Sequence, residues 1–145
     1  MGMGRDGPDR GAVVTCILSR TRIVLVMNEQ GSFDSPRWKL PGGNLEGKER
    51  IVSAAIRECF EETGILLLSK EILLHSWHWR GEEGYRPHLC IAQVTEEKLD
   101  TRLEVGQETY GTLLVRAFKR TQVLGMPDLL DKHRVLIEEV FEFLT

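Results

Sequence analysis

The chain has 145 residues, of which 41% are hydrophobic, and its formal net charge is −3. A chain of this length and composition is expected to fold as one domain with its own core, without disulfide or metal staples. The small acidic excess, 22 acidic against 19 basic residues, argues against a broad nucleic-acid-binding surface. No stretch approaches membrane-spanning length, and residues 1–10 contain no apolar run typical of a signal peptide.

The chain has three cysteines, Cys16, Cys59 and Cys90. They are odd in number, widely spaced and embedded in apolar runs, so they do not have the spacing of a disulfide framework. We expect three reduced core residues and a cytoplasmic protein.

The chain begins with a glycine-rich, charged stretch over residues 1–10, for which we expect a flexible N-terminal arm. A single domain is expected to follow over residues 11–145. Its first elements are two short runs rich in Val and Ile, Ala12–Ser19 and Arg22–Met27, which predict a pair of strands.

A long amphipathic helix is predicted after a loop at Asn28–Arg37, a short strand at residues 38–40 and a glycine turn at residues 41–43. The helix runs from about Glu49 to Thr63 and stops at Gly64. Its apolar residues recur at three- and four-residue steps, as one buried stripe of a helix requires. They are Ile51, Val52, Ala55, Ile56, Cys59 and Phe60.

Strand-like sequence follows the helix. Ile65–Leu68 is a β-compatible run, and Glu71–Trp79 and Arg86–Thr95 have the residue composition of strands. The last two flank Gly81–Gly84, a turn sequence, and therefore predict a hairpin.

The C-terminal third predicts a loop and a second helix. Residues 96–111 are polar and acidic, so we expect a loop with at most short ordered pieces. Thr112–Phe118 suits either a last strand or the start of a helix. Pro127 suits the first turn of a helix that reaches Phe143. The order of strands and helices predicts an α/β fold, with helices packed on a mixed sheet.

Three carboxylates, Glu58, Glu61 and Glu62, lie on adjoining positions of the long helix. Like charges at these spacings cost an isolated helix roughly 0.2–0.5 kcal/mol per pair, and Arg57 offsets part of that cost. A solvated acidic face is the ordinary explanation. The alternative is a site for a hard divalent cation, whose ligands are carboxylate and backbone oxygens.

This stretch resembles the Nudix box, the signature of the Nudix hydrolase family. The box requires a Gly, a Glu six positions later, an Arg-Glu pair eight positions after that, then Glu-Glu, Gly and an aliphatic residue. All of these positions are matched by Gly43, Glu49, Arg57, Glu58, Glu61, Glu62, Gly64 and Ile65. Cys59 occupies a slot that is normally aliphatic, a mild departure because a buried cysteine behaves as a small hydrophobe.

The resemblance implies an α/β/α sandwich with a mixed β-sheet flanked by helices. It also implies an enzyme that uses Mg²⁺ or Mn²⁺ and water to split the pyrophosphate linkage of a nucleoside diphosphate joined to another group. The metal ligands carried over from the box are Glu58, Glu61 and Glu62, with a backbone oxygen of Gly43 or Gly42 as a weaker candidate. Arg57 is implied to orient a glutamate through an ion pair, with Glu49 as an outer partner in the same network.

The general base is not assigned by the resemblance. It lies inside the box in some family members and on a later loop in others. Glu58 or Glu61 is the candidate within the box, and Glu104 or Glu108 is the candidate beyond it. For the last two, ordinary surface charge is the competing interpretation.

The substrate is also left open. Arg80 stands where ADP-ribose hydrolases of the family carry a proline, so that substrate is not supported. A small nucleotide, such as a nucleoside triphosphate or a nucleotide sugar, is the expected partner. Trp77 and Trp79 share a face of their predicted strand and suit either base stacking or packing, including packing in a homodimer.

Two alternative functions remain. One is a sensor that binds a nucleotide without hydrolysing it. The other is an enzyme of the same fold that acts on RNA 5′ ends or on an isoprenoid diphosphate.

Overall fold

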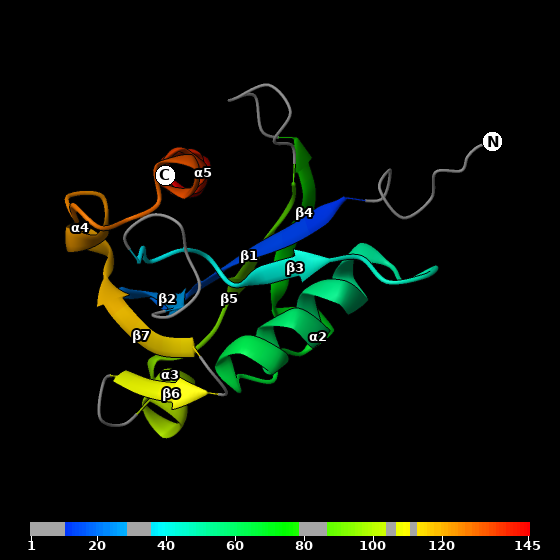
Figure 1. The fold of residues 1–145 in the computed structure, drawn as a ribbon, viewed down its shortest axis with the longest axis horizontal. Coiled ribbons are helices and arrows are strands. Elements are labelled where there is room, and N and C mark those ends of the chain that lie inside the picture. Colours follow the sequence, from blue (N-terminus) through cyan, green and yellow to red (C-terminus); the bar gives the residue numbers. More distant parts are fainter. Residues whose placement is uncertain (1–10, 29–35, 79–86, 104–106, 111–112) are drawn as a thin grey trace.

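A mixed β-sheet forms the middle layer of the protein (Figure 1). The computed structural model describes residues 11–28, 36–78, 87–103, 107–110 and 113–145, and the structural statements below refer to these. The strands are β1 Ala12–Leu18, β2 Arg22–Asn28, β3 Gly42–Asn44, β4 Ile72–His78, β5 His88–Gln93, β6 Gln107–Tyr110 and β7 Leu113–Lys119. Their order is β4-β5-β1-β2-β7-β6, and β3 pairs with β1.

β1 occupies the centre of this arrangement. It runs parallel to β5 from Val13 to Leu18 and antiparallel to β3 at its N-terminal end. Its other end turns directly into β2, whose far side pairs antiparallel with β7. The sheet is therefore mixed, as the sequence predicts.

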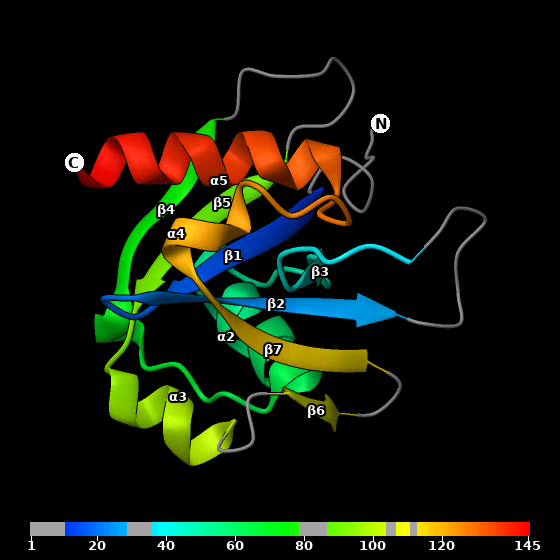
Figure 2. The same cartoon turned by 90° about the vertical axis from the view of Figure 1, so that its left-hand side faces the viewer.

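Helices cover both faces of the sheet (Figures 1 and 2). They are α2 Ile51–Thr63, α3 Glu96–Arg102, α4 Arg120–Val123 and α5 Asp131–Leu144, with a 3₁₀ turn, η1, at Ser69–Glu71. The long helices α2 and α5 lie on opposite faces, which gives three layers. No helix in the described part of the chain is long and apolar enough to cross a membrane.

The side chains of β1 explain the two covered faces. Val14, Cys16 and Leu18 belong to the buried cluster that includes Leu136, Ile137 and Val140 of α5. The alternate residues Val13 and Ile17 belong to clusters that include residues of α2. Successive side chains of a strand point to opposite faces, so a strand that is buried at successive positions requires cover on both. Each such side chain contributes roughly 1.5–3 kcal/mol on burial.

Several sequence predictions are confirmed. The strand pair at the N-terminus, the two strands at 72–78 and 88–93 and the box helix all form, with ends within about two residues of those expected. The run at 112–118, left open between strand and helix, is the strand β7. The predicted arm at 1–10 and the predicted turn at 81–84 lie outside the described residues.

Four local predictions are wrong. The glycine turn is in part the strand β3, because Gly42 and Gly43 pair with Val14 and Val13 at the end of β1. A Cβ at Gly42 would lie 2.3 Å from the carbonyl oxygen of Val13, so only glycine allows that approach. The run Ile65–Leu68 lies in an extended segment outside the strands.

The polar stretch 96–111 contains the helix α3 and the strand β6. The hydroxyl of Thr95 caps α3 by accepting a hydrogen bond from the Lys98 N–H at 3.0 Å, and two glutamates fill its first turn. Leu99 and Leu103, one turn apart, are buried. The spacing of Leu99 and Leu103 and the capping residue Thr95 indicate a helix in the sequence. The many charged residues around them made the stretch resemble a loop.

The C-terminal helix starts at Asp131 and not at Pro127. The Trp38 N–H donates to the Asp128 carbonyl at 2.8 Å, and the Leu130 N–H donates to the Trp38 carbonyl at 2.9 Å. These bonds hold residues 128–130 extended beside Trp38, so the helix begins only after them.

His133 of α5 anchors the chain that leads into β3. It is buried, and its Nδ1 accepts a hydrogen bond from the Leu40 N–H at 2.9 Å. Burial, together with the positive charges of Lys39 and Lys132, lowers its pKa to about 4. The neutral ring is therefore the form that the folded protein holds.

This predicts a loss of stability in mild acid. Below pH ~6.5 the unfolded chain takes up a proton that folded His133 does not, so the free energy of unfolding should fall by about 1 kcal/mol between pH 7.5 and 5.5. His133→Asn, which keeps an acceptor in place, should reduce that loss. Urea denaturation at the two pH values measures both, and equal losses in the two proteins would contradict the prediction.

Candidate active site

Arg57 lies at the centre of the strongest polar cluster on α2. Its Nε donates to Oε2 of Glu49 at 2.7 Å, and its Nη2 donates to Oε1 of the same carboxylate at 2.9 Å. Its Nη1 lies 3.0 Å from Oε2 of Glu58 and 3.2 Å from Oε1 of Glu61. Nη2 also donates to the carbonyl of Asn44 in β3 at 3.1 Å. One guanidinium thus ties the helix to the chain that precedes it.

The loop before α2 adds a contact that the sequence reasoning missed. Oε2 of Glu46 lies 3.4 Å from Nη1 of Arg57. The Glu46 N–H donates to Oε1 of Glu49 at 3.1 Å, and the Glu49 N–H donates to the Glu46 carbonyl at 2.9 Å. In the sequence, this contact is indicated by the three-residue spacing of Glu46 and Glu49. The two hydrogen bonds from the guanidinium to Glu49 raise the pKa of Arg57, so this side chain stays positively charged.

Glu58 is buried against Gly43. A Cβ on Gly43 would lie 2.2 Å from Oε2 of Glu58 and 2.5 Å from Oε1, so glycine is required for the carboxylate to lie there. Only 9% of the residue's surface is exposed. Burial raises the pKa of Glu58, and the hydrogen bond and positive charge of Arg57 act against that rise.

Glu62 and Glu61 lie in different surroundings. Oε1 of Glu62 accepts a hydrogen bond from the Gly42 N–H at 2.9 Å, and partial burial raises its pKa against the effect of this bond. The Glu61 side chain is 54% exposed. Along this side of α2, Glu58 is therefore buried, Glu62 is partly buried and Glu61 is exposed.

The donor chemistry fits a hard divalent cation. Carboxylate oxygens beside a glycine backbone are what Mg²⁺ and Mn²⁺ prefer, and a cation would offset the burial cost of Glu58 and Glu62. As they stand, however, the described residues include no group of three acidic, His or Cys side chains close enough to hold one ion. In this arrangement the Arg57 guanidinium contacts Glu58 and Glu61.

Other predicted site residues lie beyond what the structure describes. These are Glu104 and Trp79, and the side chains of Trp77 and Glu108. The backbone of Glu108 is in β6, opposite Val115 of β7. The role of either glutamate as a base stays a prediction.

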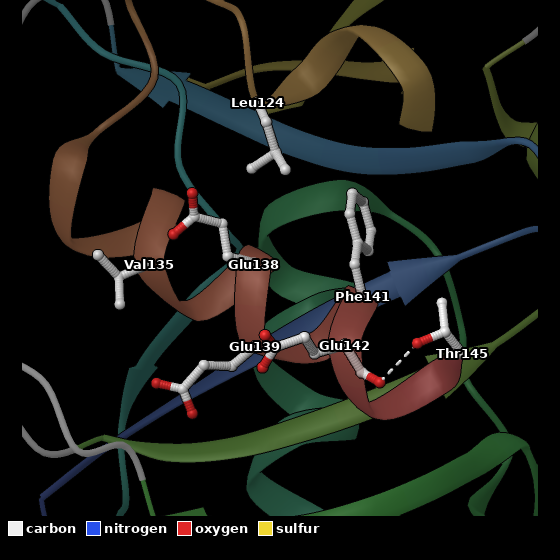
Figure 3. Close-up of a pocket in the computed structure, with 7 residues that line it drawn as sticks. All are labelled: Leu124, Val135, Glu138, Glu139, Phe141, Glu142 and Thr145. Carbon is white, nitrogen blue, oxygen red and sulfur yellow. Dashed lines mark hydrogen bonds between the residues drawn. The ribbon is translucent and has the colours of Figure 1, made fainter.

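A second acidic surface lies on the far side of the sheet. A hollow of about 500 Å³ runs along α5, lined by Leu124, Val135, Glu138, Glu139, Phe141, Glu142 and Thr145 (Figure 3). Its carboxylates come from one helix and point in different directions. It lacks the arginine and glycine backbone that organise the cluster on α2.

Removing Arg57 should destabilise the fold. In Arg57→Gln, the half-buried carboxylates of Glu49 and Glu58 lose their main partner, which should cost about 1–3 kcal/mol of unfolding free energy. The matched control is Arg50→Gln, an exposed arginine just before the same helix. Chemical denaturation measures both variants, and equal stabilities would show that the Arg57 cluster does not support the fold.

Solved structures with this fold are numerous, at low sequence identity. One is a mutT/nudix family protein from Listeria innocua, with a TM-score of 0.68 and 19% identity, covering 98% of this chain and 96% of that one. Another is NrtR of Shewanella oneidensis, with a TM-score of 0.71 and 19% identity, covering 92% and 62%. At this identity they establish the fold, an α/β/α sandwich of the Nudix type.

Curated relatives match parts of the chain. A human protein, nucleoside diphosphate-linked moiety X motif 6, is 37% identical over 70 residues, 42% of this chain and 22% of its own. An m7GpppN-mRNA hydrolase of Danio rerio is 34% identical over 89 residues, 59% and 28% of the two chains. Diphosphoinositol polyphosphate phosphohydrolase 3-beta of Bos taurus is 26% identical over 106 residues, 71% and 63%. The matches span less than two thirds of each relative's length.

The match to the family as a whole is broader. The family model described as the NUDIX domain matches residues 8–136, which include the whole Arg57 cluster and every strand of the described sheet. The chain belongs to the NUDIX domain family.

Proposed function

We propose that this protein is a metal-dependent hydrolase that cleaves a pyrophosphate linkage in a nucleoside diphosphate joined to another group. The observation that carries the proposal is the cluster in which Arg57 contacts Glu49, Glu58 and Glu61 directly beside Gly43. A solvated acidic face needs neither a buried carboxylate nor a glycine that makes room for it.

The proposed metal ligands are Glu58, Glu61 and Glu62, with a backbone oxygen of Gly43. Bound Mg²⁺ or Mn²⁺ would neutralise charge on the phosphate oxygens and make a water easier to deprotonate. The environments of the glutamates support a division of work. Glu58 and Glu62 are held against the glycine strand, whereas Glu61 is exposed enough to meet a water molecule.

Arg57 is proposed as a positioning residue. Its two hydrogen bonds to Glu49 hold the guanidinium in place. The guanidinium then orients the carboxylates of Glu58 and Glu61. For the general base, the exposure of Glu61 favours it over the buried Glu58. Glu104 and Glu108 stay as the candidates outside the box.

The expected substrate is a small nucleotide, such as a nucleoside triphosphate or a nucleotide sugar. The names of the relatives include a hydrolase of capped mRNA and one of diphosphoinositol polyphosphates. What these molecules share is a phosphoanhydride, so we assign the bond and not the attached group. The similarity to the mRNA hydrolase supports RNA 5′ ends as a second candidate substrate.

The three cysteines support a cytoplasmic setting as part of the proposal. All three are buried and none forms a disulfide bond, and burial raises the pKa of Cys59 to about 12, which keeps it as an unreactive thiol.

A substrate panel tests the proposed reaction. Nucleoside triphosphates, nucleotide sugars, capped RNA and a diphosphoinositol polyphosphate would each be incubated with Mg²⁺ or Mn²⁺, and the products separated. We expect hydrolysis that EDTA abolishes, and a loss of roughly 100-fold or more in kcat for Glu61→Gln and Glu62→Gln.

Glu97→Gln, an exposed glutamate on α3, is the matched control and should keep full activity. Binding of a nucleotide without any product would favour the sensor alternative. Full activity in both box variants would show that these carboxylates do not serve the reaction.

Gly43→Ala tests the position of Glu58 separately. The new methyl group would overlap the Glu58 carboxylate and displace it, while Gly125→Ala would have its nearest contact at 3.7 Å. We expect Gly43→Ala to stay folded by circular dichroism and to lose roughly tenfold or more in kcat. Unchanged turnover in the folded variant would remove Glu58 from the proposed site.

A further inference from the structure

Lys39 is a half-buried lysine in the short segment that leads into β3. Its N–H donates to the Val26 carbonyl at 2.9 Å, and its carbonyl accepts from the Val26 N–H at 2.8 Å. These two bonds fix the backbone of this position against β2. Lysine is mostly exposed in folded proteins, so a lysine held partly inside the molecule requires an explanation.

The Lys39 side chain points to the face of the sheet that α2 covers. Its chain neighbours, Trp38 and Leu40, both belong to the buried cluster on the α5 face. Side chains alternate along an extended chain, so Lys39 points to the other face. Val26, which is directly opposite, belongs to the cluster that includes Cys59 of α2, and directly paired residues share a face. Two separate observations therefore give the same direction.

This direction brings Lys39 towards the carboxylates of the candidate active site. Gly42, three residues further along the segment, donates its N–H to Oε1 of Glu62 at 2.9 Å. Three residues of extended chain span about 10 Å. Burial raises the pKa of Glu62, and the positive charge of Lys39 is among the effects that act against that rise. The two side chains are thus near enough to interact through space.

Lys39 nevertheless forms no ion pair with a described carboxylate. Within the described part of the chain, it is Arg57 that forms the ion pairs with Glu49, Glu58 and Glu61. The Lys39 ammonium has three N–H donors, and no described residue accepts from them. A half-buried cation therefore stands beside the acidic cluster without a direct partner.

We infer that Lys39 binds a phosphate oxygen of the substrate. The inference rests on the proposed function, because the phosphate chain is the anion that a pyrophosphate hydrolase brings to this face of α2. An ammonium binds phosphate as a point charge, and the carboxylates nearby would repel the same oxygens. The base and the sugar of a nucleotide carry no negative charge for Lys39 to match. Lys39 thus recognises the phosphate chain, the part that all of the candidate substrates share.

The first test measures binding to a phosphate chain that cannot be hydrolysed. Methylenediphosphonate with Mg²⁺ would be titrated into the full chain by calorimetry. Lys39→Met should raise its Kd at least roughly tenfold, and Lys39→Arg should recover most of the affinity. The matched control is Lys48→Met, an exposed lysine in the loop before α2, which should bind as the wild type does. Circular dichroism checks the fold, and Lys39→Gln replaces the methionine variant if that one does not fold.

A second measurement separates contact with phosphate from an indirect effect through Glu62. Mn²⁺ alone would be titrated into the wild type and Lys39→Met in the absence of any phosphate. Loss of a positive charge should leave Mn²⁺ affinity equal or higher, because like charges no longer repel. A variant that loses Mn²⁺ and diphosphonate binding together would show that Lys39 acts by placing Glu62, and would overturn the inference.

Kinetics distinguish this inference from the proposed function. For a substrate that the wild type hydrolyses, Lys39→Met should raise KM at least roughly tenfold and change kcat by less than about threefold. Normal hydrolysis with unchanged Kd and KM in Lys39→Met would overturn the role of Lys39 and leave the hydrolase standing. Binding of the diphosphonate that depends on Lys39, in a protein that hydrolyses nothing, would refute the hydrolase and support the phosphate contact. A wild type that binds no phosphate compound would overturn both.

Discussion

The fork between Arg57 and Glu49 is the contact on which the candidate site depends. It fixes a permanent charge at the N-terminal half of α2, and that charge in turn holds Glu58 and reaches Glu61. Without a fixed cation, three carboxylates on adjoining positions would repel one another, and a buried carboxylate would have no compensation. The arginine also bonds the carbonyl of Asn44, so it joins helix and strand.

The sheet gives this contact a firm base. β3 is three residues long, but it pairs with the end of β1, and β1 is buried on both faces. The chain entering β3 is held at Leu40 by buried His133 and at Lys39 by two backbone hydrogen bonds to Val26. The site therefore rests on segments from the N-terminus, the middle and the C-terminus of the chain.

Local patterns in the sequence predicted the long elements well. The helix α2 has an apolar stripe, of which only Phe60 is exposed, and a glycine stop, and the strands β1 and β2 are mostly apolar runs, so each contains its own signal. The box motif likewise indicated the ion pairs by which Arg57 joins Glu49 and the glutamates of the helix. The joint role of Glu58, Glu61 and Glu62 as metal ligands stays a prediction. The elements that were predicted wrongly depend on contacts with residues that are distant in the sequence. β3 exists because β1 lies beside it, and α5 starts late because Trp38 holds residues 128–130 extended.

The bond from the Gly42 N–H to Glu62 has a further consequence. With the contact of Gly43 and Glu58, it couples the last turns of the helix to the same short strand that the sheet holds. Strand, helix and carboxylates are then linked as one block, so that a shift of β3 would displace the Glu58 and Glu62 carboxylates. In the proposed hydrolase, such a block would hold the reacting phosphates, and residues outside it would contact the attached group.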